Sequence, residues 1–470
     1  MKHFVMRRFV TVLCASGIFG ISSQAMASAF QLWEQDGASV GNYHAGYAAE
    51  ANDASTAWYN PAGITRFQNQ QIVFGGSAIM SDFKYKGNVS VTENSLFLIP
   101  TPPFTRISPT TYTFNNVTAQ GGEFSIVPAL HYVTPLTERL GFGFSVDVPF
   151  GLKTNYGKST PLRYAATMTS ITVIDISPSL GFKVTDKASI GAGFDIQRAY
   201  AEFDSVAGLI NPSPFAAKTI DPASDTISTN KANDTGYGYH LGALYEFTPN
   251  TRAGISYHSQ VVHHFTGNSR FEGKIAALVN NHVSPLISGN AYTNVKLPAY
   301  TALSIFHKLN PNWALLGSAI YTQWSSFNTL NLNGVAGAVN NPNTIIASST
   351  DIQVTIPEHY RNTWNISLGA NYYPTDTIIV RGGVGYDQSP IQDAYRNVQL
   401  PDNDRYVVAV GGHFQATKTV GLDLGWVHVF IRDANVNPPA LVTGAESVST
   451  NGSVSGGADV FSGQVTWDIA

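Results

Sequence analysis

Histidine and aspartate residues that could support chemistry occur at only a few places in this 470-residue sequence. His263 and His264 form the most obvious metal-ligand pair, but neighbouring residues of an extended strand point to opposite faces. Asp402 and Asp404 flank Asn403, and this spacing suits either a Ca²⁺ ligand set or a simple Asx turn. From these residues we expect no metal site.

A hydrolase would require a serine nucleophile beside a histidine base. His240 and His413 lie in alternating segments that turn them to the polar side, but no G-x-S-x-G motif accompanies them. The sequence contains no phosphate-binding loop and no nucleotide fingerprint. We therefore expect a protein that is not an enzyme and needs no cofactor.

Residues 1–27 have the organisation of a secretory signal peptide. Basic residues precede an apolar core at 9–21, and Ala25-Met26-Ala27 forms a small-x-small cleavage site. Cys14, the only cysteine, lies in that core, and the bulky Leu13 before it argues against lipid attachment. The exported chain would then contain no cysteine, which excludes disulfides, thiol catalysis and Cys-ligated metals.

The composition indicates that much of the surface does not face water. Charged residues make up 12% of the chain, against about 25% in soluble domains. No apolar run of ~18–20 residues follows residue 30, so membrane-spanning helices are not expected. Cleavage removes three basic and no acidic residues from a net charge of −4, leaving −7, which argues against nucleic-acid binding.

Segments of ~10 residues with alternating apolar and polar residues are typical of transmembrane β-barrels. In 405–415 one face carries Tyr406, Val408, Val410 and Phe414, as expected of a lipid-facing strand with aromatic ends. Fourteen segments follow this template: 71–83, 123–134, 139–150, 170–184, 188–203, 236–247, 251–264, 295–308, 313–326, 361–374, 377–387, 404–416, 420–432 and 458–469.

The connections between these segments alternate between short and long. Six are short and polar, near 135–138, 186–187, 249–250, 310–312, 374–375 and 417–418. The longer ones include 84–122, 204–235, 265–294 and 327–360. Short periplasmic turns and long extracellular loops predict an all-β fold, a 14-stranded antiparallel transmembrane β-barrel in the bacterial outer membrane.

Insertion into that membrane implies two partners, outer-membrane lipid and the barrel-assembly machinery. Such barrels commonly end in an aromatic residue, whereas this chain ends in Ala470, with Trp467 the last aromatic residue.

Residues 28–70 precede the first strand and are rich in Ala, Gly and Asn. Their composition fits a periplasmic tail and a plug inside the barrel equally well. Asn60, Pro61, Ala62 and Gly63 would supply a fixed turn in either case.

Several ordered motifs resemble the FadL/TodX (OMPP1) family of outer-membrane transporters for long-chain fatty acids and other hydrophobic compounds. They are Ser28–Leu32, the NPAG turn, Gly141-Phe142-Gly143, Phe150-Gly151-Leu152, Tyr386–Pro390 and Leu400–Arg405. The resemblance implies that residues 28–70 form an N-terminal hatch inside a barrel of residues 71–470. It also implies capture of cargo on extracellular loops, a pocket touching the hatch, and a lateral exit at the third strand.

Two long loops carry apolar residues that usually mark a binding surface when they face water. The candidates are Leu209, Ile210 and Phe215 in one loop and Leu278, Val279 and Leu286 in the other. Packing of one loop on another would explain the same residues. At the end of the third strand, Pro149 cannot donate to the ladder and Gly151 tolerates a kink, so we expect the lateral gate there.

A buried fatty-acid carboxylate would need a basic partner. Arg361 and Arg405 have the inward parity of their strands, while Arg198 matches a basic position of the family but has outward parity. Pairing with wall acids such as Asp195, Asp402 or Asp404 would explain the arginines as well. Through the resemblance, Phe30 is expected to touch the ligand.

The sequence thus predicts passive uptake of long-chain fatty acids, or of another hydrophobic small molecule. A transporter of uncharged aromatic or aliphatic hydrocarbons, and an adhesive or phage-receptor barrel, remain as alternatives.

Overall fold

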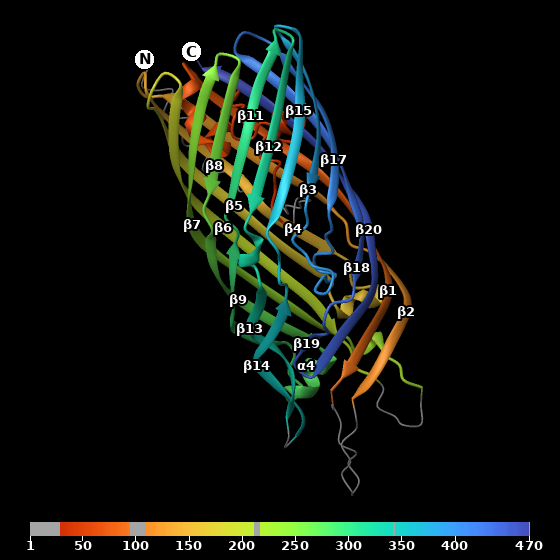
Figure 1. Cartoon of the computed structure of the whole chain (residues 1–470). Helices are drawn as coiled ribbons and strands as arrows, with labels where there is room; N and C mark the ends of the chain where they lie inside the picture. The colour runs from red at the N-terminus through yellow and green to blue at the C-terminus, as the bar shows by residue number, and fades with distance from the viewer. Residues whose placement is uncertain (1–28, 95–108, 211–216, 342–343, 470) are drawn as a thin grey trace, which may run out of the picture.

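The computed structural model describes residues 29–94, 109–210, 217–341 and 344–469. Strands dominate, and they run steeply around a tall barrel with the N-terminal segment inside its upper half in this view (Figure 1). None of the helices in these described ranges has the length and hydropathy of a membrane span.

Fourteen of the strands close into an antiparallel barrel through an unbroken cycle of pairings. They are β1 (Gln70–Glu93), β3 (Phe124–Pro135), β4 (Leu140–Asn155), β5 (Met168–Lys183), β6 (Ala188–Ala207), β7 (Thr226–Thr248), β8 (Thr251–His258), β11 (Tyr300–Asn310), β12 (Trp313–Thr322), β15 (Thr363–Thr375), β16 (Ile378–Asp387), β17 (Arg405–Gln415), β18 (Val420–Val436) and β20 (Glu446–Ile469). β1 and β20 close the barrel along their full lengths, from Gln70 opposite Ile469 to Glu93 opposite Glu446. The predicted fourteen-stranded barrel is confirmed.

The alternation of each strand follows the two environments of the wall. In β17, Tyr406, Val408, Val410 and Phe414 are exposed on the outside, while Arg405 is buried inside. Apolar side chains that are exposed in the isolated chain form the lipid-facing band that a transmembrane barrel requires.

Six further strands extend the wall on the side away from the short turns. They are β2 (Thr110–Gln120), β9 (Val261–Gly273), β10 (Leu286–Leu297), β13 (Thr329–Asn341), β14 (Thr344–Pro357) and β19 (Leu441–Thr443), with the short helix α4 (Lys274–Val279). Segments that we expected to be long loops therefore contain strands. Backbone N–H and C=O groups form hydrogen bonds where two chain segments run side by side, outside the membrane as well as within it.

Two expected strands contain a break. The segment 251–264 is divided after His258 into β8 and β9, and 295–308 is divided between β10 and β11 at Pro298. β8 pairs with β11 in the barrel wall, whereas β9 and β10 pair with each other in the extension beyond the wall, at the extracellular end. The expected single strands are wrong there, because the polar alternation continues past the membrane and hides the break.

The N-terminal segment, residues 29–69, lies in the lumen and contains α2 (Gly37–Val40), α3 (Thr56–Tyr59) and the 3₁₀ helix η1 (Pro61–Arg66). It contacts opposite sides of the wall. Backbone N–H groups of Gly37 and Ala38 donate to Gln464 Oε1 of β20 at 2.9 and 3.2 Å, and Arg252 Nε of β8, on the opposite side of the barrel, donates to the Ala49 carbonyl at 2.6 Å. The segment therefore spans the width of the barrel.

Two wall glycines make this close packing possible. A Cβ built on Gly242 would come within 1.9 Å of Asn60 Oδ1, and one on Gly254 within 1.9 Å of the Ala48 carbonyl oxygen. Any side chain at these positions would push the N-terminal segment away from β7 and β8. Three short 3₁₀ helices complete the described structure: η2 (Pro161–Tyr164), η3 (Pro222–Ser224) and η4 (Trp324–Ser326).

Candidate functional site

The N-terminal residues of the luminal segment are paired with the inner edge of β4. The Leu32 N–H donates to the Pro149 carbonyl at 2.8 Å, and the Gly151 N–H donates to the Phe30 carbonyl at 2.9 Å. Gln35 adds two further bonds to the backbone of Val148, each of 3.0 Å. These residues thus occupy backbone groups of β4 that a neighbouring strand would ordinarily use.

The neighbouring strand β3 does not pair with this part of β4. Its ladder with β4 runs from Pro135 opposite Gly141 to Leu130 opposite Val146 and stops there. On the other side of β4, the register with β5 shifts between Asp147 and Phe150. The predicted gate residues Pro149 and Gly151 lie in this stretch, where β4 bends and is paired with the N-terminal segment rather than with β3.

Phe30 lies in an aromatic cluster next to this stretch. Its ring centroid is 4.8 Å from Trp324, 5.6 Å from Phe327 and 6.0 Å from Phe150. All four side chains are buried. Trp324 was expected at the end of the strand 313–326 and Phe327 at the start of a loop, and neither was predicted as a site residue, because only the fold brings them to Phe30.

Arg405 is buried beside the start of the N-terminal segment and is neutralised by two acids. Its Nη2 donates to Asp402 Oδ1 at 2.6 Å, and its Nη1 lies 3.6 Å from Asp387 Oδ2. The other Asp402 oxygen accepts from the Ala29 N–H at 3.1 Å and from Ser389 Oγ at 2.7 Å. The arginine therefore holds the residue that precedes Phe30, and its own charge is already paired.

The other two predicted arginines do not face the lumen. Arg361 precedes β15, its side chain is 48% exposed, and its Nη2 lies 3.6 Å from Asp404 Oδ1. Arg198 is exposed on the outer face of β6, where its Nη1 donates to Thr235 Oγ1 at 2.9 Å. The inward placement expected for Arg361 is wrong because its strand begins only at Thr363, so strand parity does not reach it.

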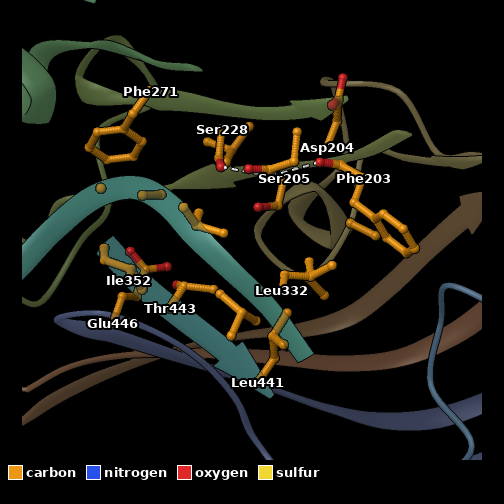
Figure 2. A pocket seen from close by; sticks show the side chains of 18 of the residues that line it. Phe203, Asp204, Ser205, Ser228, Phe271, Leu332, Ile352, Leu441, Thr443 and Glu446 are labelled. Atoms are coloured by element: carbon orange, nitrogen blue, oxygen red, sulfur yellow. Dashed lines mark hydrogen bonds between the residues drawn. The ribbon is translucent and has the colours of Figure 1, made fainter. Parts of the chain in front are cut away.

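An apolar cavity, here called the outer pocket, lies at the extracellular end (Figure 2). Side chains from β6, β7, β9, β13, β14 and β19 converge on it. Its apolar lining includes Phe203, Val206, Phe271, Ile275, Leu332, Val335, Ile352, Val354, Ile356 and Leu441. Two acids, Asp204 and Glu446, also line it, and its lining contains no lysine, arginine or histidine.

The predicted loop residues lie around this pocket rather than in it. Leu209, Val279 and Leu286 are partly buried against the cluster that contains Phe271 and Ile275. These contacts support the alternative in which the loops pack on each other.

Three further loop residues were predicted. Ile210 is fully buried and bridges to Ile220, whereas Leu278 is 53% exposed. Phe215 lies outside the described residues. The pocket's main wall was missed, although the i, i+2 spacing of Ile352, Val354 and Ile356 was a strand signal in a presumed loop.

The acids of the outer pocket lie beyond the membrane-spanning parts of their strands. Burial raises the pKa of Asp204 to about 6 and that of Glu93 to about 7. The pKa of Glu446 is raised well above its usual value by burial and by the nearby Glu93 carboxylate. Burial at this end of the barrel thus favours the protonated form of these carboxyl groups.

The NPAG turn fixes the other end of the N-terminal segment. Asn60 Nδ2 donates to the carbonyls of Ala48 at 2.6 Å and Ala243 at 3.1 Å, and its Oδ1 accepts from the Ala62 N–H at 3.1 Å. Pro61 begins η1, and a Cβ on Gly63 would come within 2.1 Å of Thr56 Oγ1. The turn is thus a specific anchor on β7.

A family model described as "Outer membrane protein transport protein (OMPP1/FadL/TodX)" matches residues 18–468. The chain belongs to this family. The "Long-chain fatty acid transport protein" of Salmonella typhi is 28% identical over 89% of this chain and 91% of that protein. The "47 kDa outer membrane protein" of Pasteurella multocida (strain Pm70) is 30% identical over 90% of this chain and 92% of that protein.

Solved structures show the same architecture. A FadL homologue from Pseudomonas aeruginosa aligns with a TM-score of 0.79 at 25% identity, covering 94% of this chain and 100% of its own. The toluene transporter TodX from P. putida aligns with a TM-score of 0.62 at 15% identity, covering 92% and 98%, and shows the fold alone. The relatives are named as outer membrane or transport proteins, and this family member is a β-barrel of the bacterial outer membrane.

Proposed function

We propose that this family member takes up long-chain fatty acids passively across the outer membrane. Cargo enters the outer pocket, passes to Phe30 and leaves sideways at Pro149–Gly151 of β4. The names of relatives that are 26–28% identical over most of both chains support this class of cargo.

A continuous apolar cluster carries the proposal. Leu330, Val335, Ile352, Val354 and Ile356 belong to the same buried cluster as Phe30, Phe150, Leu152, Trp324 and Phe327. Several of these residues also line the outer pocket. An acyl chain could therefore exchange one apolar contact for another from the extracellular end to β4, without its methylene groups meeting water.

Residues 28–70 act as the hatch in this proposal. Their first described residues supply the hydrogen bonds that β4 lacks from β3. A shift of residues 29–32 would expose the vacant edge of β4 and open a lateral path into the lipid. The anchor at Asn60 would let the remainder of the segment stay in place.

A second candidate function is uptake of an uncharged hydrocarbon. The outer pocket contains acids and no basic side chain, and the buried Arg405 is already paired with Asp402 and Asp387. A neutral chain, or a protonated fatty acid, meets no unfavourable charge there. An adhesive barrel would not need a continuous apolar lining, so we do not propose that role.

Binding of labelled oleate and labelled hexadecane to the purified protein tests the two candidates. We expect Phe30→Ala to lower oleate uptake by cells that lack their own transporter, while Phe74→Ala on the lipid-facing surface leaves it unchanged. Binding of hexadecane alone would favour the second candidate. If neither compound binds, both transport proposals fail.

A further inference from the structure

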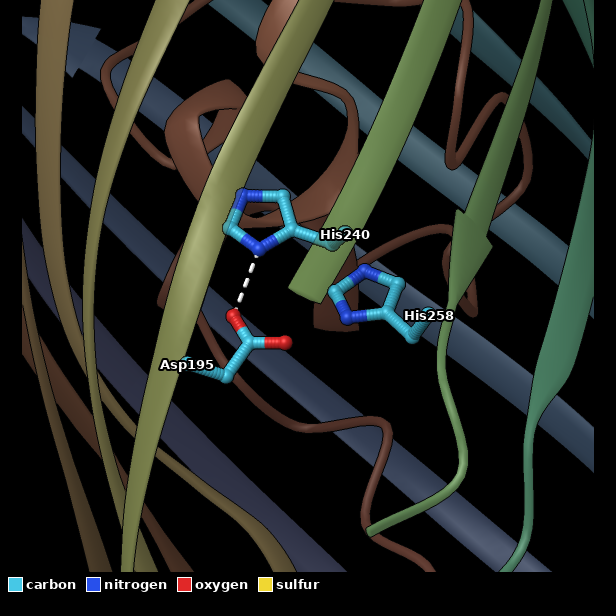
Figure 3. A group of neighbouring side chains, drawn as sticks. All are labelled: Asp195, His240 and His258. Atoms are coloured by element: carbon cyan, nitrogen blue, oxygen red, sulfur yellow. Dashed lines mark hydrogen bonds and ion pairs between the residues drawn. The ribbon is translucent and has the colours of Figure 1, made fainter. Parts of the chain in front are cut away.

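Two histidines and one aspartate from neighbouring wall strands meet in the lumen (Figure 3). They are Asp195 on β6, His240 on β7 and His258 on β8, and one ligand atom of each lies within 4.8 Å of the others. All three are buried, with exposed fractions of 2%, 0% and 3%. A buried group of this composition must be hydrogen-bonded or hold a cation.

The strand register places the three side chains together. His240 is directly opposite His258, and Asp195 is opposite Gly238, two residues from His240 on the same face of β7. Gly193 makes room for the His240 ring, since a Cβ there would lie 2.1 Å from His240 Cε1. The positions are therefore set by the wall itself.

Both ring nitrogens of His240 face oxygen acceptors. Its Nδ1 lies 2.6 Å from Asp195 Oδ1, and its Nε2 lies 3.2 Å from the Ala57 carbonyl oxygen. A neutral imidazole has one N–H and can satisfy only one of these contacts. An imidazolium would satisfy both contacts, and so would a metal ion between Nδ1 and the carboxylate, because Nε2–H would then donate to Ala57 as ligating histidines commonly do.

The second histidine has an unused ligand atom. His258 Nε2 is buried and has no hydrogen-bond partner within the described residues. Its ring is held between His240, at 5.0 Å, and Tyr300, at 4.5 Å. The free carboxylate oxygen of Asp195 points toward this ring in Figure 3.

We propose that Asp195, His240 and His258 bind a divalent transition metal of the Zn²⁺ class, with water in the remaining position. Two imidazoles and one carboxylate suit Zn²⁺, Co²⁺ or Ni²⁺ better than Mg²⁺ or Ca²⁺. Metal–ligand distances of ~2.0–2.2 Å require the three groups to move closer together on binding, and one of the two stacked imidazoles must turn so that its ring nitrogen faces the metal. The site stands apart from the cargo route and does not depend on the nature of the cargo.

Bound metal would clamp the N-terminal segment to the wall. The Ala57 carbonyl accepts from His240, and the Trp58 ring lies 4.6 Å from that of His258, so α3 contacts both histidine ligands. Ordering the two rings around a metal would order these contacts as well. We expect Zn²⁺ to reduce local opening of α3 without altering the barrel strands on the opposite side.

Metal titration of tag-free protein in detergent, stripped with EDTA, tests the site. We expect one Co²⁺ per chain with the visible absorption of a low-coordinate nitrogen–oxygen site, displaced by Zn²⁺. His258→Gln and Asp195→Asn should weaken binding at least about tenfold, while His263→Gln, a buried histidine outside the cluster, should not. Heat-modifiable migration of each variant on gels checks that the barrel is folded.

Two results would overturn the proposal. One is the absence of stoichiometric binding of Co²⁺, Ni²⁺ and Zn²⁺ to folded protein; the other is equal affinity in the wild type and in His258→Gln. Hydrogen exchange supplies an independent measurement, since Zn²⁺ should slow the amides of residues 56–60 in the wild type and not in His258→Gln. Equal exchange with and without Zn²⁺ in the wild type would disprove the clamp.

Discussion

The outer pocket and the periplasmic half of the lumen differ in what they bury. The outer pocket is lined by apolar side chains from strands at the extracellular end. The periplasmic half of the lumen is filled by the N-terminal segment, and its wall carries buried polar groups such as Asp147, Asp175 and Gln197. Both oxygens of Asp147 lack a hydrogen-bond partner within the described residues.

This difference indicates a direction for hydrophobic cargo. The apolar cluster that begins at the outer pocket ends at Phe30, Phe150 and Leu152, beside the edge of β4 that pairs with the N-terminal segment instead of β3. Movement along the barrel axis toward the periplasm would take an acyl chain past buried carboxylates and the N-terminal segment. A sideways path into lipid keeps it among apolar groups, and four experiments test this difference between the two regions.

The first prediction concerns the free energy of unfolding and the ion pairs around Arg405. Arg405→Ala leaves Asp402 and Asp387 buried without their cation, which should cost about 3–5 kcal/mol of unfolding free energy. Arg361→Ala, at a half-exposed pair, should cost less than about 1 kcal/mol. Urea unfolding of protein refolded in vesicles measures both, and equal losses would contradict the assignment of Arg405 to the packed interior.

The second prediction concerns oleate uptake and the hydrogen bond between Gly151 and Phe30. Gly151→Pro removes the N–H that donates to Phe30 and should displace that ring, lowering oleate uptake at least about tenfold. Gly151→Ala keeps the N–H and serves as the control. Wild-type uptake by the proline variant would argue against an exit at β4.

A charge in the outer pocket should weaken cargo binding. Ile352→Asp buries a carboxylate in the apolar lining and should lower oleate affinity about tenfold. Leu278→Asp places the same charge on an exposed side chain of α4 and should have little effect. Fluorescence titration with a labelled fatty acid compares them, and a similar loss in both would move the binding site to the α4 surface.

The smallest effect is a pH dependence at the extracellular end. Because the folded pKa of Glu93 is raised from 4.5 to about 7, its contribution to stability is present below pH 4.5 and lost as pH rises through 7. We expect the paired ends of β1 and β20, at Glu93 and Glu446, to be less stable at pH 8 than at pH 5 by about 1 kcal/mol, after discounting for solvent access. Hydrogen exchange, corrected for intrinsic rates, should show a smaller difference in Glu93→Gln than in the wild type, because Glu446 keeps its own raised pKa.

The sequence predicted the wall far better than the site. Alternation located all fourteen membrane strands, because lipid outside and polar lumen inside impose opposite demands on successive residues. The inference that His263 and His264 point to opposite faces is confirmed, since His263 is buried and His264 is exposed. Strand ends were less accurate, as at Arg361, because a turn or a break leaves the polar alternation unchanged.

The site could not be read in the same way. Phe30, Trp324 and Phe327 are far apart in sequence and meet only because the N-terminal segment folds back into the lumen. The pairing of Arg405 with Asp402 was an open alternative, which the buried geometry favours over a free cation. His240 and His258 come together through the register of β7 and β8, and no local motif records that register.

The sequence alone was enough to predict alternating segments that close into a barrel of the outer membrane, because lipid acts on each strand separately. What lies inside that barrel follows from contacts that only folding creates. Luminal contacts join distant segments, and their distances depend on strand register, on the bend in β4 and on the glycines that admit the N-terminal segment.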